Sequence, residues 1–262
     1  MLLDWIHYLT TPAPSDFRRV GFVRDSIWLL SRSRRCQSAW RSHLSRSREL
    51  VTEAAAALPE RRTVVVLGSG LLDDVPFETL ARSFTSVVLV DVVHPWPARA
   101  AARRHRNVRL VDFDLSGCVD WMLGRSRDIG PVLPDVCLGS DVDLVISANV
   151  LSQLPILPLD WFETHGRVLP DLGRRIVTAH LDGLAALTAR VCLITDVTQI
   201  EADRAGKIVD STDLLHGVSV GMPERDWDWD LAPFGEAARG SRLVHTVYGF
   251  GDWRRNRKRG PH

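Results

Sequence analysis

Short runs of Val, Ile and Leu recur between residues 63 and 195 and alternate with segments of helical pattern. The strongest runs are Thr63–Leu67, Ser86–Asp91, 142–147 and 191–195, and 108–111 is a weaker one. Strands that are apolar throughout are typical of parallel sheets buried on both faces, and parallel strands need helical crossovers between them. The sequence therefore predicts an α/β fold with a twisted, mainly parallel sheet.

Helices are expected between these strands, from about residue 73 to 83, from about 97, and along a stripe that contains Leu172, Ile176 and His180. The last apolar run, 243–250, alternates loosely and no helical pattern follows it. It is predicted to be an antiparallel strand, paired with the region near 227–231. The basic run 254–260 is expected to be a frayed tail.

The first 60 residues have a different pattern and are predicted to form an N-terminal helical extension to a main domain of residues 61–262. Apolar residues at helical spacing predict an amphipathic helix over about 38–58 that docks on the main domain. The stripe consists of Trp40, Leu44, Val51, Ala55 and Leu58. The opposite face is rich in arginine, which suits either a solvated surface or contact with RNA or an acidic substrate.

Composition narrows the possible environments. The 262 residues carry a net charge of +1, so bulk charge gives no case for a nucleic-acid or membrane partner. The four cysteines are scattered without metal-ligand spacing, so neither a disulfide framework nor a metal site is expected. The N-terminus has no basic region of a signal peptide, and no apolar run suits a membrane span. A cytoplasmic location is expected.

A glycine turn follows the first strand directly. Gly68, Ser69 and Gly70 stand between a strand and a helix, where glycines allow a ligand to approach the backbone. Asp91 ends the second strand, 21 residues after Gly70. A carboxylate at this position can accept hydrogen bonds from both ribose hydroxyls, which indicates an adenosine ligand.

Two carboxylates distinguish among adenosine ligands. A dinucleotide motif would have a third glycine at position 73, but the chain has Asp73 followed by Asp74. One of them is expected to cap the following helix, and both would repel a pyrophosphate. S-adenosylmethionine carries a sulfonium and an ammonium and no phosphate, so carboxylates beside it are favourable.

The order of "VVVLGSG", "VVLVD", "NVRLVDFDLSG", "DLVISANVLSQLP" and "ARVCLITDV" resembles the Rossmann-like S-adenosylmethionine-dependent methyltransferases. The resemblance covers roughly residues 62–200 and implies a sheet of about seven strands with the last antiparallel. It implies S-adenosylmethionine as the cofactor and methyl transfer to an unidentified acceptor as the function. Its site residues would be Gly68, Ser69 and Gly70 at the methionine part, Asp91 with Val92 at the ribose, Asp114 and Leu115 at the adenine, and Asn149 beside the methionine part or the methyl group.

Two positions depart from the family pattern. Val66 stands where the family usually has Asp or Glu, and Leu72 replaces a third glycine. Asp73 or Asp74 could substitute for the missing carboxylate. Alternatively, the chain is a non-catalytic relative that acts as a binding or scaffold module. No catalytic residue is assigned, and small molecules, proteins and RNA all remain open as acceptors, as does the oligomeric state.

Further polar residues lie near the strand ends. Asp112 is an alternative to Asp114 at the adenine. His94 is expected at the adenine edge or at a helix cap, Gln153 in a loop contact, and His180 as a satisfied core histidine. Trp227 and Trp229 alternate with aspartates, so both tryptophans should share one face of a strand, either in the core or as a wall for a cationic acceptor.

Overall fold

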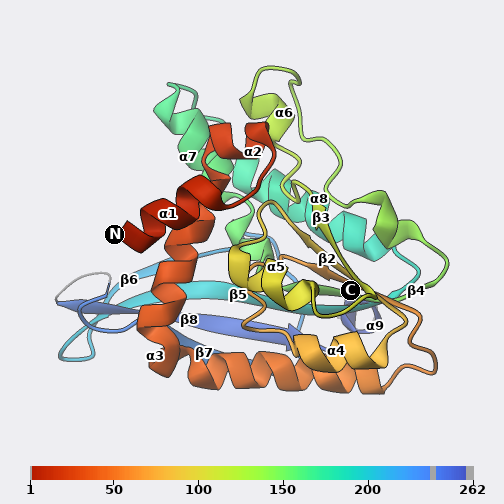
Figure 1. Cartoon of the computed structure of the whole chain (residues 1–262). Helices are drawn as coiled ribbons and strands as arrows, with labels where there is room; N and C mark the ends of the chain where they lie inside the picture. The colour runs from red at the N-terminus through yellow and green to blue at the C-terminus, as the bar shows by residue number, and fades with distance from the viewer. Residues whose placement is uncertain (1, 237–239, 258–262) are drawn as a thin grey trace.

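All the strands belong to one sheet, and their order confirms the predicted fold class. The computed structural model describes residues 2–236 and 240–257 (Figure 1). Strands β1 to β5 are parallel in the order β3-β2-β1-β4-β5, and β8 lies antiparallel between β5 and β7. The sheet is mainly parallel with antiparallel strands at one end, as predicted, and it has an additional strand, β6, on β5. The strands are β1 (Thr63–Leu67), β2 (Ser86–Asp91), β3 (Val108–Asp112), β4 (Val142–Ala148), β5 (Arg190–Asp203), β6 (Ile208–Asp213), β7 (Arg225–Ala232) and β8 (Ser241–Phe250).

At the antiparallel end of the sheet, the pairing of β7 with β8 was predicted from the sequence and strand β6 was not. Trp227 of β7 lies opposite Val247 of β8, which confirms the expected pairing of these regions. Strand β6 was not predicted, because every residue of Ile208–Asp213 is exposed and no apolar pattern marks it. It pairs with Thr198 to Ala202, in the second half of β5.

Helices cover both faces of the sheet. Figure 1 shows α7 and α8 on one side and the long part of α3 with α4 on the other. The helices are α1 (Leu2–Thr10), α2 (Ser15–Val20), α3 (Phe22–Ala56), α4 (Phe77–Ser83), α5 (Trp96–Ala102), α6 (Val119–Met122), α7 (Ile156–Thr164), α8 (Leu172–Ala186), α9 (Trp253–Arg257), and the 3-10 helices η1 (Asp135–Leu138) and η2 (Leu151–Gln153).

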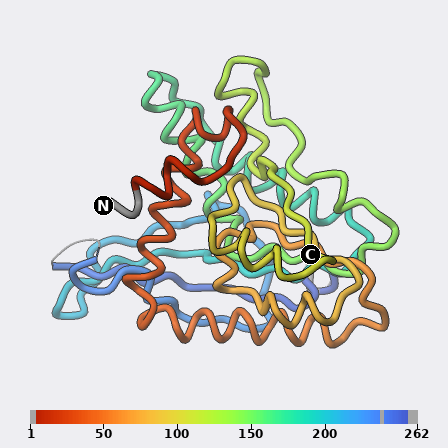
Figure 2. The backbone as a smooth tube through the Cα atoms, viewed as in Figure 1, coloured from red at the N-terminus to blue at the C-terminus, as the bar shows by residue number. Residues whose placement is uncertain are grey.

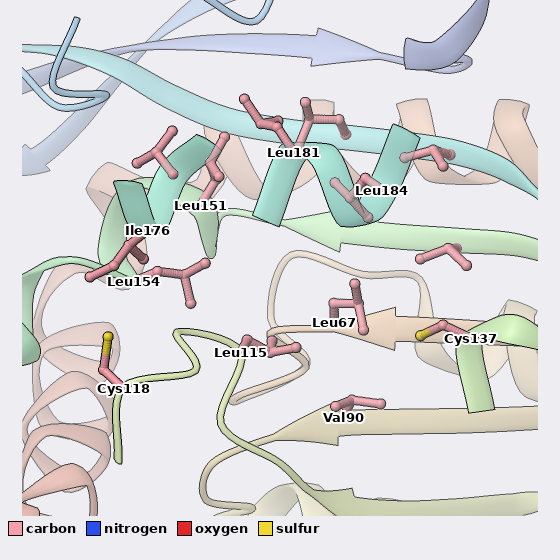
Figure 3. Packing of buried hydrophobic residues seen from close by; sticks show 14 of the residues in the cluster. Leu67, Val90, Leu115, Cys118, Cys137, Leu151, Leu154, Ile176, Leu181 and Leu184 are labelled. Carbon is pink, nitrogen blue, oxygen red and sulfur yellow. The ribbon is translucent and has the colours of Figure 1, made fainter. Parts of the chain in front are cut away.

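Successive residues of each central strand enter opposite cores, as the period of two requires. Val65 and Leu67 of β1 pack in the cluster that contains Ile176 and Leu184 of α8 (Figure 3). Val64 and Val66 pack in the other cluster, against α3 and α4. Because both faces are buried, the central strands carry almost no polar residues, which explains why the sequence located them well.

Helix α3 is longer than the helix predicted over 38–58, because it begins at Phe22, directly after Gly21. Gly21 has φ = 111°, a conformation that favours glycine and separates α2 from α3. Figures 1 and 2 show the first part of α3 at the edge of the sheet and the second part running along its face. Trp40 and Val51 are buried against the sheet, and the Trp40 indole donates to the Leu231 carbonyl of β7 at 2.9 Å.

The helix after the glycine turn begins later than predicted. Helix α4 starts at Phe77, and neither Asp73 nor Asp74 caps it. The Asp73 carboxylate accepts a hydrogen bond from Ser33 of α3, and Asp74 accepts one from Asn149. Contacts from other parts of the chain therefore hold residues 71–76 as a loop.

Two expectations concern the ends of the chain and the membrane. Within the described residues, no helix combines the length and the apolar character needed to cross a bilayer. The basic run expected to fray is helical up to Arg257 as part of α9, and residues 258–260 lie outside the described residues.

Candidate functional site

A cavity of about 390 Å³ opens at the carboxyl ends of β1, β2 and β4 and is bordered by α3. Open α/β sheets bind ligands at this edge. The predicted site residues that line it are Gly68, Gly70, Asp91, Val92, Asp114, Leu115 and Asn149. Ser69 is the exception, since its side chain is buried outside the lining and its hydroxyl has no partner among the described residues.

The glycine turn is fixed to the neighbouring strand. The backbone N–H groups of Gly68 and Ser69 both donate to the carbonyl of Val90 in β2, at 3.0 and 3.1 Å. Gly68 has φ = 72°, and a Cβ atom there would lie 2.5 Å from the Cβ of Val150. Val150 directly follows Asn149, so the absence of a side chain at Gly68 lets two loops of the site approach each other.

Gly68→Ala is expected to destabilise the fold strongly. The left-handed backbone costs an L-residue about 1–2 kcal/mol, and the contact with Val150 adds a clash. The matched control is Gly124→Ala, because Gly124 has φ = 75° but open space around its Cβ position. Urea unfolding of both variants should give a larger loss of free energy of unfolding for Gly68→Ala. Equal losses would show that the approach of Val150 is unimportant.

Asp91 links the turn to the cavity. Its Oδ2 accepts the N–H of Gly70 at 2.7 Å, and its Oδ1 lies 3.4 Å from the N–H of Val93. Burial raises the pKa of Asp91 above its usual value. Each carboxylate oxygen has two lone pairs, so acceptor capacity remains for a ligand.

Asp114 holds the loop after β3. Its carboxylate accepts the N–H and hydroxyl of Ser116 at 2.9 and 2.6 Å and the N–H of Val119 at 2.8 Å. These three bonds leave one of four lone-pair sites unused. Asp112, the alternative for the adenine, does not line the cavity and lies 3.5 Å from His94 and 3.7 Å from Arg99.

Asn149 directly follows β4, has a left-handed conformation with φ = 50°, and is buried. Its Nδ2 lies 2.7 Å from Oδ2 of Asp74, and its Oδ1 has no hydrogen-bond partner among the described residues. The Gln153 side chain donates to the Asn149 carbonyl at 2.5 Å, as the predicted loop contact required. Burial raises the pKa of Asp74 to about 6, although the bond from Asn149 opposes this shift.

Helix α3 contributes a wall that the sequence analysis did not assign to the site. Trp40, His43 and Leu44 line the cavity, and the His43 ring stacks on Trp229 with centroids 4.0 Å apart. The signal was present, since His43 lies three residues after Trp40 and therefore on the same face of the helix. That face was interpreted only as a docking surface.

The two tryptophans of β7 are buried on one face of the strand, as period two predicted, while Asp226 and Asp228 are exposed. Trp229 lines the cavity, but one face of its ring is covered by His43. Trp227 does not line the cavity, and its indole N–H donates to Nδ1 of His43 at 3.1 Å.

Two further histidines lie in the core. His180 is fully buried with Nε2 3.2 Å from the Ser147 hydroxyl, and burial lowers its pKa to about 4, which confirms the core assignment. His94 was expected at the adenine edge or at a helix cap. It is instead fully buried beneath β3, with Nε2 3.2 Å from the Val111 carbonyl.

A buried polar cluster supports the segment after Asn149. Asp196 accepts hydrogen bonds from Ser152 and from Nδ1 of His245, the latter at 2.6 Å. Burial would raise the pKa of Asp196, but these bonds hold it below its usual value. The carboxylate lies between the hydroxyl and the imidazole, so Ser152 and His245 do not form the direct serine–histidine pair of a nucleophilic site.

No protein-family model matches the chain, and no curated protein is similar to it. Among solved structures, it is similar to the N-methyltransferase NodS from Bradyrhizobium japonicum, with 13% identity, 80% of this chain and 87% of that chain covered, and a TM-score of 0.41. It is also similar to the 1,6-didemethyltoxoflavin-N1-methyltransferase from Burkholderia thailandensis, with 16% identity, 91% of each chain covered, and a TM-score of 0.40. These similarities are distant, and the fold assignment rests on the strand order and direction.

Proposed function

We propose that the protein transfers a methyl group from S-adenosylmethionine to an acceptor. The observation that carries this proposal is the combination of groups around one cavity. A glycine turn, the strand-end carboxylate Asp91, and the two loop carboxylates Asp73 and Asp74 all line it. The first two suit an adenosine, and the last two suit a ligand whose other end is cationic.

The charge of the lining supports a cationic ligand over a diphosphate. Five aspartates line the cavity, and Arg32 is the only arginine or lysine among the lining residues that the structure describes. Two unit charges 4 Å apart interact by about 4 kcal/mol at an effective dielectric constant of 20, so the balance of sign matters. The aspartates are Asp25, Asp73, Asp74, Asp91 and Asp114.

In this proposal the adenosine lies at the ends of β2 and β3. Asp91 accepts hydrogen bonds from the ribose hydroxyls, with Val92 beside it. The unused acceptor site of Asp114 receives the adenine amine, and Leu115 packs on the ring. All four residues line the same cavity.

The methionine part would lie between the glycine turn and Asn149. Each loop carboxylate accepts one side-chain hydrogen bond, Asp73 from Ser33 and Asp74 from Asn149, and Asp74 is taken as the partner for the ammonium because it lies beside Asn149. Asn149 offers an unpartnered buried oxygen at the same place. When bound, the cofactor supplies an electrophilic methyl group on sulfur. The protein's part is to orient the two reactants, and a base is needed only for a protonated acceptor.

The rest of the lining favours an acceptor with an apolar surface. Phe22, Leu29 and Leu157 line the cavity, together with the exposed Trp28 and Ile156. The volume of about 390 Å³ lies in the range of small-molecule pockets, roughly 300–1,000 Å³, which suits the proposed cofactor. Cation–π binding of an amine on Trp229 is less favoured, since His43 covers one face of that ring.

The competing function is a non-catalytic binding module on the same fold. It is favoured by Val66, which is fully buried in the apolar cluster beneath α3, so no carboxylate stands at the position where the family has one. Cofactor binding separates the two functions.

S-adenosylhomocysteine is expected to raise the melting temperature, and NAD is not. A ligand at 100 times its dissociation constant stabilises the fold by about 2.7 kcal/mol, which corresponds to roughly 5–10 °C for a chain of this size. Differential scanning fluorimetry of the full chain at pH 8 measures both ligands. Stabilisation by NAD alone would overturn the proposed cofactor, and stabilisation by neither would favour the binding module.

A further inference from the structure

Four side chains from distant parts of the chain form a series of polar contacts at the cavity, in the order Trp227, His43, Asn149 and Asp74. Trp227 of β7 contacts His43 of α3 at 3.1 Å, and His43 Nε2 lies 3.3 Å from the amide of Asn149. The same amide atom lies 2.7 Å from Asp74. Trp227, His43 and Asn149 are each at most 5% exposed, so each of their polar atoms needs a partner within the protein or from a ligand.

The first contact fixes the tautomer of His43. An indole N–H can only donate, so Nδ1 of His43 must accept and cannot carry a proton. Burial lowers the pKa of His43 to about 4, so the ring is neutral near pH 7. Its single proton therefore lies on Nε2, which makes His43 a donor toward Asn149 and removes it as a base at that nitrogen.

The second contact then restricts Asn149. If the amide nitrogen faces Asp74, it donates to an ionised carboxylate but also meets the N–H of His43, and Oδ1 is left without a partner. If the amide is turned, its oxygen accepts from His43 and from a protonated Asp74. Only hydrogen bonding distinguishes the two orientations of the Asn149 amide. Ionised Asp74 favours the orientation with the nitrogen toward it, and protonated Asp74 favours the orientation with the oxygen toward it.

We propose that His43, held by Trp227, is a positioning residue that favours the protonated form of Asp74 in the free protein, and that a cationic ligand group must expel this proton and turn Asn149 to bind. The inference rests on the proposed function, because the cation is the ammonium of S-adenosylmethionine. It makes cofactor affinity dependent on pH.

The charged surroundings of Asp74 are compatible with this role. The pKa of Asp74 is about 6: burial raises it most and the charge of Asp73 on the same loop also raises it, while the bond from Asn149 and the charge of Arg48 of α3 lower it. Below pH 6 the free carboxyl is neutral and binding must release its proton, so affinity falls as the pH falls. Above pH 7 the carboxyl is already ionised and affinity is constant.

Isothermal titration of the full chain with S-adenosylhomocysteine between pH 5 and 8, in two buffers of different ionisation enthalpy, measures affinity and proton release together. In the wild type we expect about three-quarters of a proton released at pH 5.5, half a pH unit below the pKa of Asp74, and affinity that falls by up to about tenfold per pH unit below pH 6.

Trp227→Phe is the decisive variant. It keeps a ring but removes the indole N–H, so His43 can carry its proton on Nδ1 and accept from Asn149 through Nε2. Ionised Asp74 is then compatible with every neighbour. We expect the fall in affinity to move to lower pH, with affinity at pH 5.5 several-fold above that of the wild type, a gain that damage to the fold would not produce.

Two comparisons isolate the effect. Trp253→Phe removes a buried indole N–H that donates to the Val220 carbonyl at 2.9 Å and lies outside the cavity lining, so it should leave the pH midpoint unchanged. Asp74→Asn should abolish most of the proton release. The pKa of Asp91 is also raised by burial, but its contribution is common to these variants and cancels in the comparison.

The outcomes distinguish this inference from the proposed function. If S-adenosylhomocysteine does not bind at any pH, the proposed function itself fails. If it binds without proton release at pH 5.5, or if Trp227→Phe keeps the wild-type midpoint, only the role of His43 and Asp74 is overturned. Should Trp227→Phe not fold, His43→Leu replaces it, because this variant also removes the N–H that faces Asn149, and the same shift of the midpoint to lower pH is expected.

Discussion

Deletion of residues 1–60 is expected to produce a chain that aggregates. Six large apolar side chains of α3 are at most 6% exposed. Burial of each contributes about 1.5–3 kcal/mol, so the deletion removes roughly 9–18 kcal/mol, which matches or exceeds the total stability of a typical domain, about 5–15 kcal/mol. The sheet face beneath α3 would also become exposed. The side chains are Val23, Ile27, Leu30, Trp40, Leu50 and Val51.

The matched control removes residues 1–10 only. Trp5, Ile6 and Leu9 of α1 are 65%, 46% and 55% exposed, so this deletion should leave a soluble protein that unfolds cooperatively. Size-exclusion chromatography and thermal unfolding compare the two truncations. A fragment 61–262 that is monomeric and as stable as the full chain would make the N-terminal region an independent arm and would strengthen a partner-binding role.

The central sheet could be predicted because its strands are buried on both faces and therefore consist of continuous apolar runs. Val64–Leu67 and Val87–Val90 are all fully buried, so selection for apolar residues leaves continuous runs. Strand β6 is fully exposed along its length and leaves no such signal. The start of α4 was predicted too early for a different reason, since Asp73 and Asp74 bind side chains 40 and 75 residues away instead of the helix end.

The residues of the candidate site also fall into two groups, those that could be predicted from the sequence and those that could not. Asp91 ends β2 and was proposed from its spacing to Gly70, whereas Asp114 and Asn149 follow the ends of β3 and β4 and were proposed from the family resemblance. Parallel strands bring their ends to one edge, so the three residues lie around one cavity. The wall of Trp40, His43 and Trp229 depends on how α3 crosses the sheet to reach β7. Side-chain spacing within α3 shows which residues share a face, but not that this face borders a cavity.

Asp91→Ala is expected to weaken the binding of S-adenosylhomocysteine by at least about tenfold. Hydrogen bonds to charged groups contribute about 1.5–3 kcal/mol each, and a loss of ~1.4 kcal/mol is a factor of ten in affinity. The variant also removes the acceptor for the N–H of Gly70, 2.7 Å away, so the turn that lines the cavity loosens. Asp91→Asn should be milder, because its amide oxygen still accepts one bond. Titration at pH 8 keeps Asp74 ionised, because the pKa of Asp74 is about 6.

Asp112→Ala is the matched control for this prediction. Asp112 ends β3 directly beside Asp91 in the sheet register, yet it does not line the cavity. Its removal should leave affinity unchanged. The simplest alternative role for Asp91 is structural, because its carboxylate holds the glycine turn whether or not a ligand is bound. In that case Asp91→Ala would lower the free energy of unfolding by ~1 kcal/mol and leave affinity unchanged. That result would remove the ribose contact and most of the case for an adenosine cofactor.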